Sequence, residues 1–195
     1  MKSAKLIIVL TITTLVSGVG LALLNSWAQP QIEAYRQKVL EQAIYEVLPG
    51  IEKYKVRKIN NTEFYEGINA AGEVSNVAFK AMGNGFQSQI RVLVGMDTEL
   101  EKIIGINLLQ QAETPGLGTK IASDPTADNP NWFMDQFEGL RLADRKIDYI
   151  KNQQPDKEDA EIKAITGATI SSESVVKIIN KTIHKNRKIY KPAQE

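Results

Sequence analysis

The chain has 195 residues, of which 43% are hydrophobic and 24% are charged, and its formal net charge at pH 7 is +1. This length suits one domain plus an additional segment, and the near-zero charge indicates no nucleic-acid partner. The absence of cysteine excludes disulfides, thiolate metal sites and iron–sulfur ligation, so redox chemistry would require a bound organic cofactor.

The N-terminal segment predicts a membrane anchor. Leu6–Leu24 is apolar and carries no charge, and it has about the length that a helix needs to cross a bilayer. Lys2 and Lys5 precede this run and the next basic residue is Arg36, so the positive-inside rule places the N-terminus in the cytoplasm. A cleaved signal peptide is the alternative, because Ser26-Trp27-Ala28 has small residues where a peptidase would cut.

An uncleaved anchor divides the chain into four segments on the two sides of a cytoplasmic (inner) membrane. They are a cytoplasmic N-terminus at 1–5, a transmembrane anchor at 6–26, a juxtamembrane helical segment at 27–50 and a domain on the periplasmic or outer side at 51–190. Within the helical segment, Pro30 is expected to interrupt the helix, which resumes over Ile32–Leu48 and ends at Pro49-Gly50.

Strands dominate the first half of the outer domain. Asn69–Gly72 provides a turn, Gly83-Asn84-Gly85 a break, and Asp97-Thr98-Glu99 joins the last two strands into a buried hairpin. Because the strands cluster instead of alternating with helices, the fold class is α+β, a single domain with an antiparallel sheet packed by helices. The predicted strands are 54–59, 63–68, 74–82, 89–94 and 103–109.

The second half of the domain is less regular. Residues 111–130 form a long irregular section of the kind that often carries function. Asn129-Pro130 then opens a short helix in which Phe133 and Phe137 share a face, and Tyr149-Ile150 begins a further strand.

The stretch ITGATISS, Ile165–Ser172, places hydroxyl and small side chains directly before the last predicted helix, with Ser172 as the expected N-cap. A helix N-terminus with accessible backbone suits a phosphate, but an ordinary Ser/Thr-rich helix cap explains the same residues without a ligand. The small residues are Thr166, Gly167 and Ala168, and the hydroxyl residues are Thr166, Thr169 and Ser171. The apolar stripe of the helix comprises Val175, Val176, Ile179 and Ile183.

The stretch ETPGLG, Glu113–Gly118, predicts a type II turn, because Pro115 and Gly116 suit its two central positions. Such a loop would present a carboxylate, a hydroxyl and the apolar side chain of Leu117, as sites for flat ring compounds do. A plain tight turn without a ligand is the alternative.

The two motifs occur together, in this order, behind one N-terminal anchor. In this combination the chain resembles the FMN-binding-domain family, and within it the G subunits of Rnf (Rsx) ion-translocating electron-transport complexes. The C subunits of sodium-translocating NADH:quinone reductase are the other close relatives, typically with longer chains. The resemblance covers the anchor, GNGFQSQIRVLVGMD, ETPGLG, NPNWFMDQFEG and AITGATISS.

The resemblance implies covalent FMN, held by a phosphoester to the hydroxyl of Thr169 and installed by a separate flavin transferase. It implies that Leu117 packs on the isoalloxazine, with Glu113 and Thr114 near the polar edge of the ring. The further cofactor-binding residues that it implies are Thr166, Gly167, Ala168, Ile170, Ser171, Gly116 and Gly118.

The implied role is that of an electron carrier in a membrane complex that couples ferredoxin and NAD to ion movement. Other subunits of that complex, the flavin transferase and membrane lipid are then the partners. No catalytic residue or metal site of its own is expected, so activity belongs to the complex. From the residues alone, a membrane-anchored binding or assembly module without flavin remains the alternative.

Several further residues have two interpretations. Lys120 and Lys163 could neutralise a phosphate or be solvated, and Lys163 stands where the family often has an acidic residue. Trp132 and Phe133 could sandwich a flavin or belong to the core. Three residues before the predicted hairpin could contact the cofactor or form a plain turn, and they are Gly85, Phe86 and Ser88.

Overall fold

The computed structural model describes residues 2–143, 145–151 and 153–190. The chain divides into two compact units, the first ending at Glu41 and the second beginning at Gln42. The sequence placed the start of the outer domain at residue 51, so the structure adds the segment 42–50 to the unit that contains the sheet.

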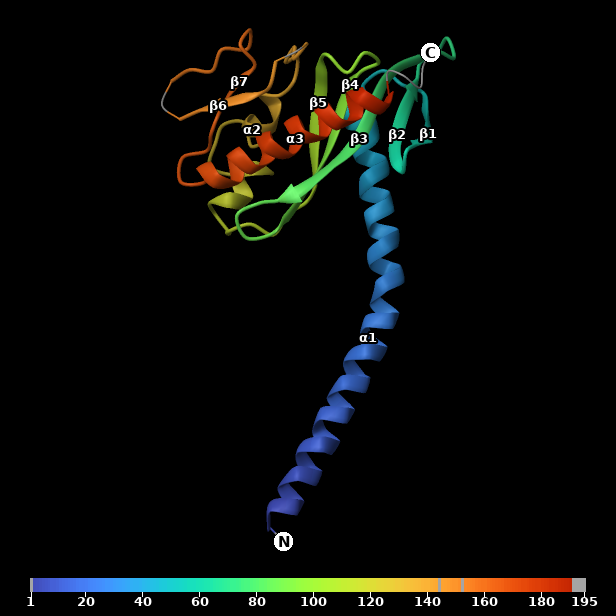
Figure 1. Ribbon diagram of the computed structural model, residues 1–195, viewed down its shortest axis with the longest axis vertical. Coiled ribbons are helices and arrows are strands. Elements are labelled where there is room, and N and C mark those ends of the chain that lie inside the picture. Colours follow the sequence, from blue (N-terminus) through green and yellow to red (C-terminus); the bar gives the residue numbers. More distant parts are fainter. Residues whose placement is uncertain (1, 144, 152, 191–195) are drawn as a thin grey trace. The chain divides into compact units, whose positions relative to one another are not determined.

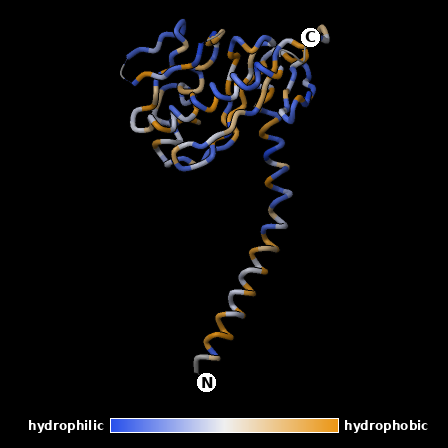
Figure 2. The backbone as a smooth tube through the Cα atoms, viewed as in Figure 1, coloured by the Kyte–Doolittle hydropathy of each residue, from blue (hydrophilic) through white to orange (hydrophobic). Residues whose placement is uncertain are grey.

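Helix α1 runs without interruption over Lys2–Val47 (Figure 1). Among the described residues it is the one helix that is long and apolar enough to span a membrane, and Figure 2 shows its hydrophobic residues gathered in the N-terminal half. The predicted break at Pro30 is wrong. Proline removes the hydrogen bond to the carbonyl of Ser26, but its fixed φ angle is compatible with a helix, so α1 continues at a cost of about 3 kcal/mol.

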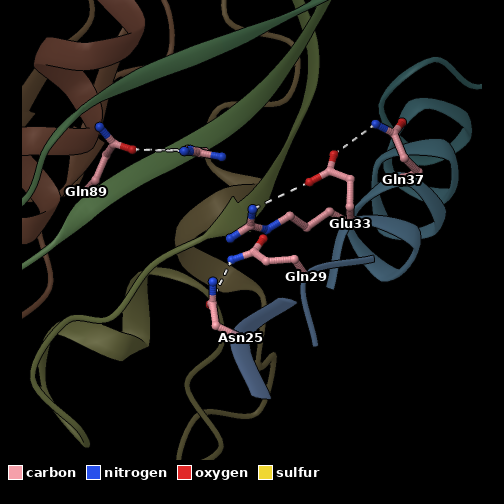
Figure 3. A network of polar contacts seen from close by, with 7 residues as sticks. Asn25, Gln29, Glu33, Gln37 and Gln89 are labelled. Carbon is pink, nitrogen blue, oxygen red and sulfur yellow. Dashed lines mark hydrogen bonds and ion pairs between the residues drawn. The ribbon is translucent and has the colours of Figure 1, made fainter. Parts of the chain in front are cut away.

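Polar side chains one turn apart pair along α1 beyond its apolar run (Figure 3). The Gln29 amide donates to Asn25 Oδ1 at 3.3 Å, and the Gln37 amide donates to Glu33 Oε1 at 3.3 Å. All four residues are exposed, so each pair contributes only about 0.2–0.5 kcal/mol. This part of α1 therefore has the surface of a solvated helix.

A five-stranded antiparallel sheet, in the order β1-β2-β3-β4-β5, is the centre of the second unit. The five predicted strands are confirmed, although β3 continues through the expected break as far as Asn84. The strands are β1 (Lys53–Ile59), β2 (Thr62–Ile68), β3 (Val74–Asn84), β4 (Gln89–Asp97) and β5 (Ile103–Gln110). The predicted turn at Asn69–Gly72 is also present, closed by a hydrogen bond from the Gly72 N–H to the Asn69 carbonyl at 3.0 Å.

Helix α3 (Thr169–Tyr190) runs across β3 and β4 on one face of the sheet (Figure 1). Alternate strand residues point to that face, since side chains in a strand alternate with period two. The predicted apolar stripe of α3, from Val175 to Ile183, is buried against them as expected. The sheet side of this core comprises Phe64, Val77, Phe79, Ala81, Ile90, Val92, Val94 and Met96.

The opposite face of the sheet is covered by residues 42–48, the last turns of α1 and the residue after them. Val47 lies against Gly95 and Gly105, which pair with each other across β4 and β5. A Cβ atom on Gly95 would stand 2.3 Å from the carbonyl oxygen of Val47, so only glycine permits this approach. Because both faces are covered, β4 is buried almost throughout, which explains its continuous apolar sequence.

The remaining elements form a layer beside the sheet and one end of α3. The short helix α2 (Trp132–Asp135) follows the 3-10 helix η1 (Gly118–Ile121). Two short strands, β6 (Asp148–Ile150) and β7 (Glu161–Lys163), pair in parallel. The strand at Tyr149 is thus confirmed, whereas β7 was not predicted because three residues are too few to show a period.

Candidate functional site

The first wall of the site is the turn at ETPGLG, which adopts the predicted conformation. The Leu117 N–H donates to the Thr114 carbonyl at 3.2 Å, and Gly116 has a φ angle of +72°. This is the geometry of a type II turn, which needs a residue that tolerates positive φ at its third position. The Gly116 N–H also donates to Thr119 Oγ1 at 3.0 Å. The turn holds Leu117 outward, with 47% of its surface exposed.

The second wall is ITGATISS, which forms a tight turn that leads directly into α3. The Ala168 N–H donates to the Ile165 carbonyl at 3.0 Å, and Gly167, at a φ angle of +80°, occupies the bend. A Cβ atom on Gly167 would stand 3.3 Å from Leu117 Cδ2, so the two walls meet here.

Helix α3 begins at Thr169, four residues before Glu173, the first helical residue that an N-cap at Ser172 implies. The prediction of Ser172 as N-cap is wrong, because Ser172 already donates its backbone N–H to the Ala168 carbonyl at 3.0 Å. Its hydroxyl instead accepts from the Ile165 N–H at 3.0 Å and donates to the Ala168 carbonyl at 3.1 Å. The hydroxyl thus closes the turn, and the N–H groups of Thr169, Ile170 and Ser171 have no partner within the helix.

Between these walls lies an open cleft of about 550 Å³. Its rim is apolar, since Phe86 and Ile170 are 56% and 55% exposed and Leu117 stands between the two walls. No side chain that lines it is charged, and Thr169, the first residue of α3, opens onto it. The lining residues are Phe86, Gln87, Thr114, Leu117, Gly118, Gly167, Ala168, Thr169, Ile170 and Ser171.

Glu113 lies behind the cleft wall and is 3% exposed. Its carboxylate accepts hydrogen bonds from the N–H groups of Phe86, Gln87 and Ser88 at 3.0, 3.1 and 3.0 Å. The hydroxyls of Ser88 and Ser171 donate to it at 3.1 and 2.7 Å. Burial raises the pKa of Glu113, but the hydrogen bonds, first that from Ser171, outweigh burial and hold the pKa below its ordinary value. The group is therefore an anion at neutral pH.

A second cavity of about 370 Å³ lies beside the cleft and gathers Lys120, Lys163 and Thr166. Lys120 is paired with Asp124 at 3.2 Å, and it also donates to Thr126 Oγ1 at 3.2 Å. The hydrogen bonds from Thr126 are the main cause that lowers the pKa of Asp124 to about 2. The two lysines and Thr166 thus line one cavity, and Thr169 lines the other.

The aromatic residues of α2 divide between the core and this second cavity. Phe133 is 1% exposed and packs against Phe137 with ring centroids 5.7 Å apart, so its assignment to the core is confirmed. Trp132 is half-buried and lines the second cavity.

Sequence reasoning missed the contact between Glu113 and the segment Gly85–Ser88. The antiparallel pairing of β4 and β5 made this contact predictable. Because β4 begins at Gln89 and β5 ends at Gln110, the loop before β4 and the segment after β5, which contains Glu113, lie side by side. Gln87 was also missed as a lining residue, and no signal in the sequence distinguished it from an ordinary turn residue.

Comparison with known proteins identifies relatives of the chain and of its fold. The chain is 26% identical to the G subunit of the ion-translocating oxidoreductase complex of Methanosarcina acetivorans over 92% of each chain. It is 30% identical to the C subunit of the Na(+)-translocating NADH-quinone reductase of Vibrio anguillarum over 64% of its own length and 48% of that relative. The crystal structure of Shewanella oneidensis NqrC has the same fold, with a TM-score of 0.55, 18% identity and coverage of 73% of this chain and 72% of that one.

A family model gives the assignment directly. The FMN-binding domain matches residues 85–184, which run from the loop before β4 into the second half of α3. Both walls of the cleft and the start of α3 lie within this match. The chain therefore belongs to the FMN-binding domain family.

Proposed function

We propose that this chain is the membrane-anchored FMN-carrying subunit of an ion-translocating oxidoreductase complex of the Rnf type, which exchanges electrons between ferredoxin and NAD. The observation that carries the proposal is the hydroxyl of Thr169, at the first residue of α3, on a cleft with an apolar rim. Membership of the FMN-binding domain family and likeness to a G subunit over 92% of both chains support it.

The cleft suits the flavin mononucleotide in size and in chemistry. Its volume of about 550 Å³ lies within the range of small-molecule sites, about 300–1,000 Å³. Leu117 and Phe86 offer exposed apolar surface on which a flat ring can pack. No charged side chain lines the cleft, so the ring would bury no unpaired charge there. FMN supplies reversible electron uptake and release when it is bound, while the protein holds and orients the ring.

We assign the attachment to Thr169 through a phosphoester of its hydroxyl. The helix N-terminus supports this assignment, because the unpaired N–H groups of residues 169–171 favour a negative phosphate there. The Ser171 hydroxyl gives its single proton to Glu113, so it can approach a phosphate only as an acceptor. The phosphate donors that the cleft itself offers are therefore the backbone N–H groups at the start of α3, whereas Thr166, Lys120 and Lys163 line the neighbouring cavity.

The N-terminal helix would anchor the chain in the membrane, with the covalently attached flavin on its outer side. One apolar N-terminal helix fits a single-pass membrane anchor, and Lys2 and Lys5 favour a cytoplasmic N-terminus with the flavin on the outer side. A covalent bond would retain the flavin there, and a flavin transferase would form it. The remaining subunits of the complex are the electron-transfer partners.

The C subunit of a sodium-translocating quinone reductase is a second candidate. Relatives of that name match this chain at 28–30% identity. The chain spans about half the length of those relatives, 48% for the protein of Vibrio anguillarum, whereas it spans 92% of the G subunit from Methanosarcina acetivorans. The difference in coverage favours the G-type subunit.

Intact-mass analysis tests the proposal. We expect the full-length chain, produced together with a flavin transferase, to gain the mass of one FMN less one water, because ester formation releases water. The same chain produced without the transferase is the control and should show the mass of the sequence alone. A colourless protein of unchanged mass from the co-production would instead favour a binding module without flavin.

A further inference from the structure

The hydrogen bonds around Glu113 form an anion site that the chain fills with its own carboxylate. Three consecutive backbone N–H groups, those of Phe86, Gln87 and Ser88, converge on the two oxygens, and the hydroxyls of Ser88 and Ser171 complete a set of five donors. Successive N–H groups that converge in this way make an anion-binding nest. In most proteins such a nest binds a ligand from outside, whereas here it is occupied internally.

The three segments that meet at this nest are the three that build the cleft. The loop 86–88 contributes Phe86 and Gln87, and the turn that follows Glu113 contributes Thr114, Leu117 and Gly118. The first turn of α3 contributes Thr169 to Ser171. The strand ladders end before these segments, at Asn84 in β3 and at Gln110 in β5. Beyond them the Gly85 N–H donates to the Ser88 carbonyl at 2.7 Å and the Ala112 N–H donates to Ser88 Oγ at 2.8 Å, and neither bond reaches α3. The Glu113 carboxylate therefore links them where the sheet no longer does.

Two glycines let the backbone lie close to the carboxylate and to its donor Ser171. A Cβ atom on Gly85 would stand 2.5 Å from Glu113 Oε1, and one on Gly118 would stand 2.9 Å from Ser171 Oγ. Both glycines were singled out in the sequence as possible cofactor contacts, yet Gly85 does not line the cleft. Its lack of a side chain serves the approach of the loop to Glu113.

We propose that Glu113 is a positioning residue for the cofactor, an internal anion that fills a five-donor nest and thereby sets the three cleft segments in their binding arrangement. The proposal rests on the proposed function, since it concerns the binding of FMN in this cleft. It differs from a direct contact between Glu113 and the flavin edge, because both carboxylate oxygens are already occupied by the protein's own donors.

Removal of the carboxylate gives a specific expectation. Glu113→Ala leaves five donors without their acceptor, among them the hydroxyl of the buried Ser171, which is more damaging than loss of the contact alone. We expect the dissociation constant for FMN to rise about tenfold or more. A small carboxylate such as formate should enter the emptied nest and restore binding, because it presents the same two oxygens to the same donors. Loss of packing alone would not respond to formate.

The experiment uses the purified, flavin-free full-length chain in detergent micelles, titrated with FMN and followed by quenching of flavin fluorescence. Each variant is measured in sodium formate and in sodium chloride of equal ionic strength. Hydrogen exchange at the amides of Phe86, Gln87 and Ser88 is recorded in parallel. We expect these amides to lose protection in Glu113→Ala and to regain it, together with FMN affinity, in formate but not in chloride.

Glu66→Ala is the matched control. Glu66 is equally buried, at 2% exposure, and pairs with Lys55 and Arg57 at 3.1 and 3.3 Å, but it lines neither cavity. Its loss should lower the melting temperature and leave the FMN affinity of the folded protein unchanged. If Glu113→Ala does not fold, Ser88→Ala keeps the charge but removes the hydroxyl that donates to Glu113 and accepts from the Ala112 N–H, and it should weaken FMN binding by a smaller factor.

The outcomes separate this inference from the proposed function. If the wild-type chain does not bind free FMN, the positioning role fails, while the proposed function still depends on covalent attachment, which the intact-mass analysis tests. If the wild type binds FMN and Glu113→Ala, or Ser88→Ala in its place, binds equally well, only the positioning role fails. A loss of binding that formate does not restore in folded Glu113→Ala also overturns the role. The loss would then have another cause than the missing anion in the nest.

Discussion

Thr169→Val is expected to abolish covalent FMN, while Thr166→Val retains it at the wild-type level. Of these two threonines, Thr169 lines the cleft and is the first residue of α3, whereas Thr166 lines the neighbouring cavity. Valine keeps the branched shape of threonine and removes only the nucleophilic oxygen. Flavin fluorescence of the denatured protein band measures the covalent fraction, because free flavin is lost on denaturation.

The fold should not change in either variant. Neither hydroxyl has a hydrogen-bond partner among the described residues, so we expect both melting temperatures to stay close to that of the wild type. Covalent flavin that persists in Thr169→Val would overturn the attachment site. Loss of flavin in both variants, with intact folds, would mean that the whole turn and not one hydroxyl decides attachment.

Gly95→Ala is expected to cause the largest loss of stability that a single methyl group can produce in this domain. The added carbon would stand 2.3 Å from the carbonyl oxygen of Val47, and a backbone atom at the end of a helix cannot move aside as a side chain can. Overpacking of this kind costs about 3 kcal/mol or more. For a domain of this size that corresponds to a fall in melting temperature of roughly 6–12 °C, measured by circular dichroism.

Gly105→Ala is the matched control, since Gly105 pairs with Gly95 on the adjacent strand. Its added carbon would stand 3.6 Å from Val47 Cα, an ordinary van der Waals distance. We expect a change of less than about 1 kcal/mol. Equal melting temperatures for Gly95→Ala and the wild type would show that the last turn of α1 does not lie against this part of the sheet.

The sheet was predictable because each of its strands has a clear pattern or a clear turn. The alternation in the second half of β3 and the β-branched run in β4 follow from burial, and burial is what the sheet and its two covers impose, whereas β2 is buried over four consecutive residues. The helix α1 was harder, since a proline usually ends a helix, and nothing in the sequence around Pro30 indicates that this one does not. The start of α3 was misplaced for a related reason, because Ser172 has the side chain of a cap but bonds to the turn before it.

The site was predictable in its membership but not in its connections. Both motifs lie on the cleft, because each combines a turn-forming glycine with residues whose side chains face outward. Glu113 contacts the distant loop at Ser88, and this contact can be inferred only from the pairing of β4 with β5, not from the motif that contains Glu113. For the same reason the sequence could not separate Lys120, Lys163 and Thr166 from the cleft that Thr169 lines.

A tandem mass spectrum of the flavin-bearing peptide identifies the residue to which FMN is attached. Trypsin cleavage after Lys163 and Lys177 releases residues 164–177, which contain Thr166, Thr169 and three serines. We expect one FMN, attached to Thr169 through its phosphate, in the chain produced with a flavin transferase. A flavin on any other residue of the peptide, or a peptide without flavin in a coloured protein, would contradict it.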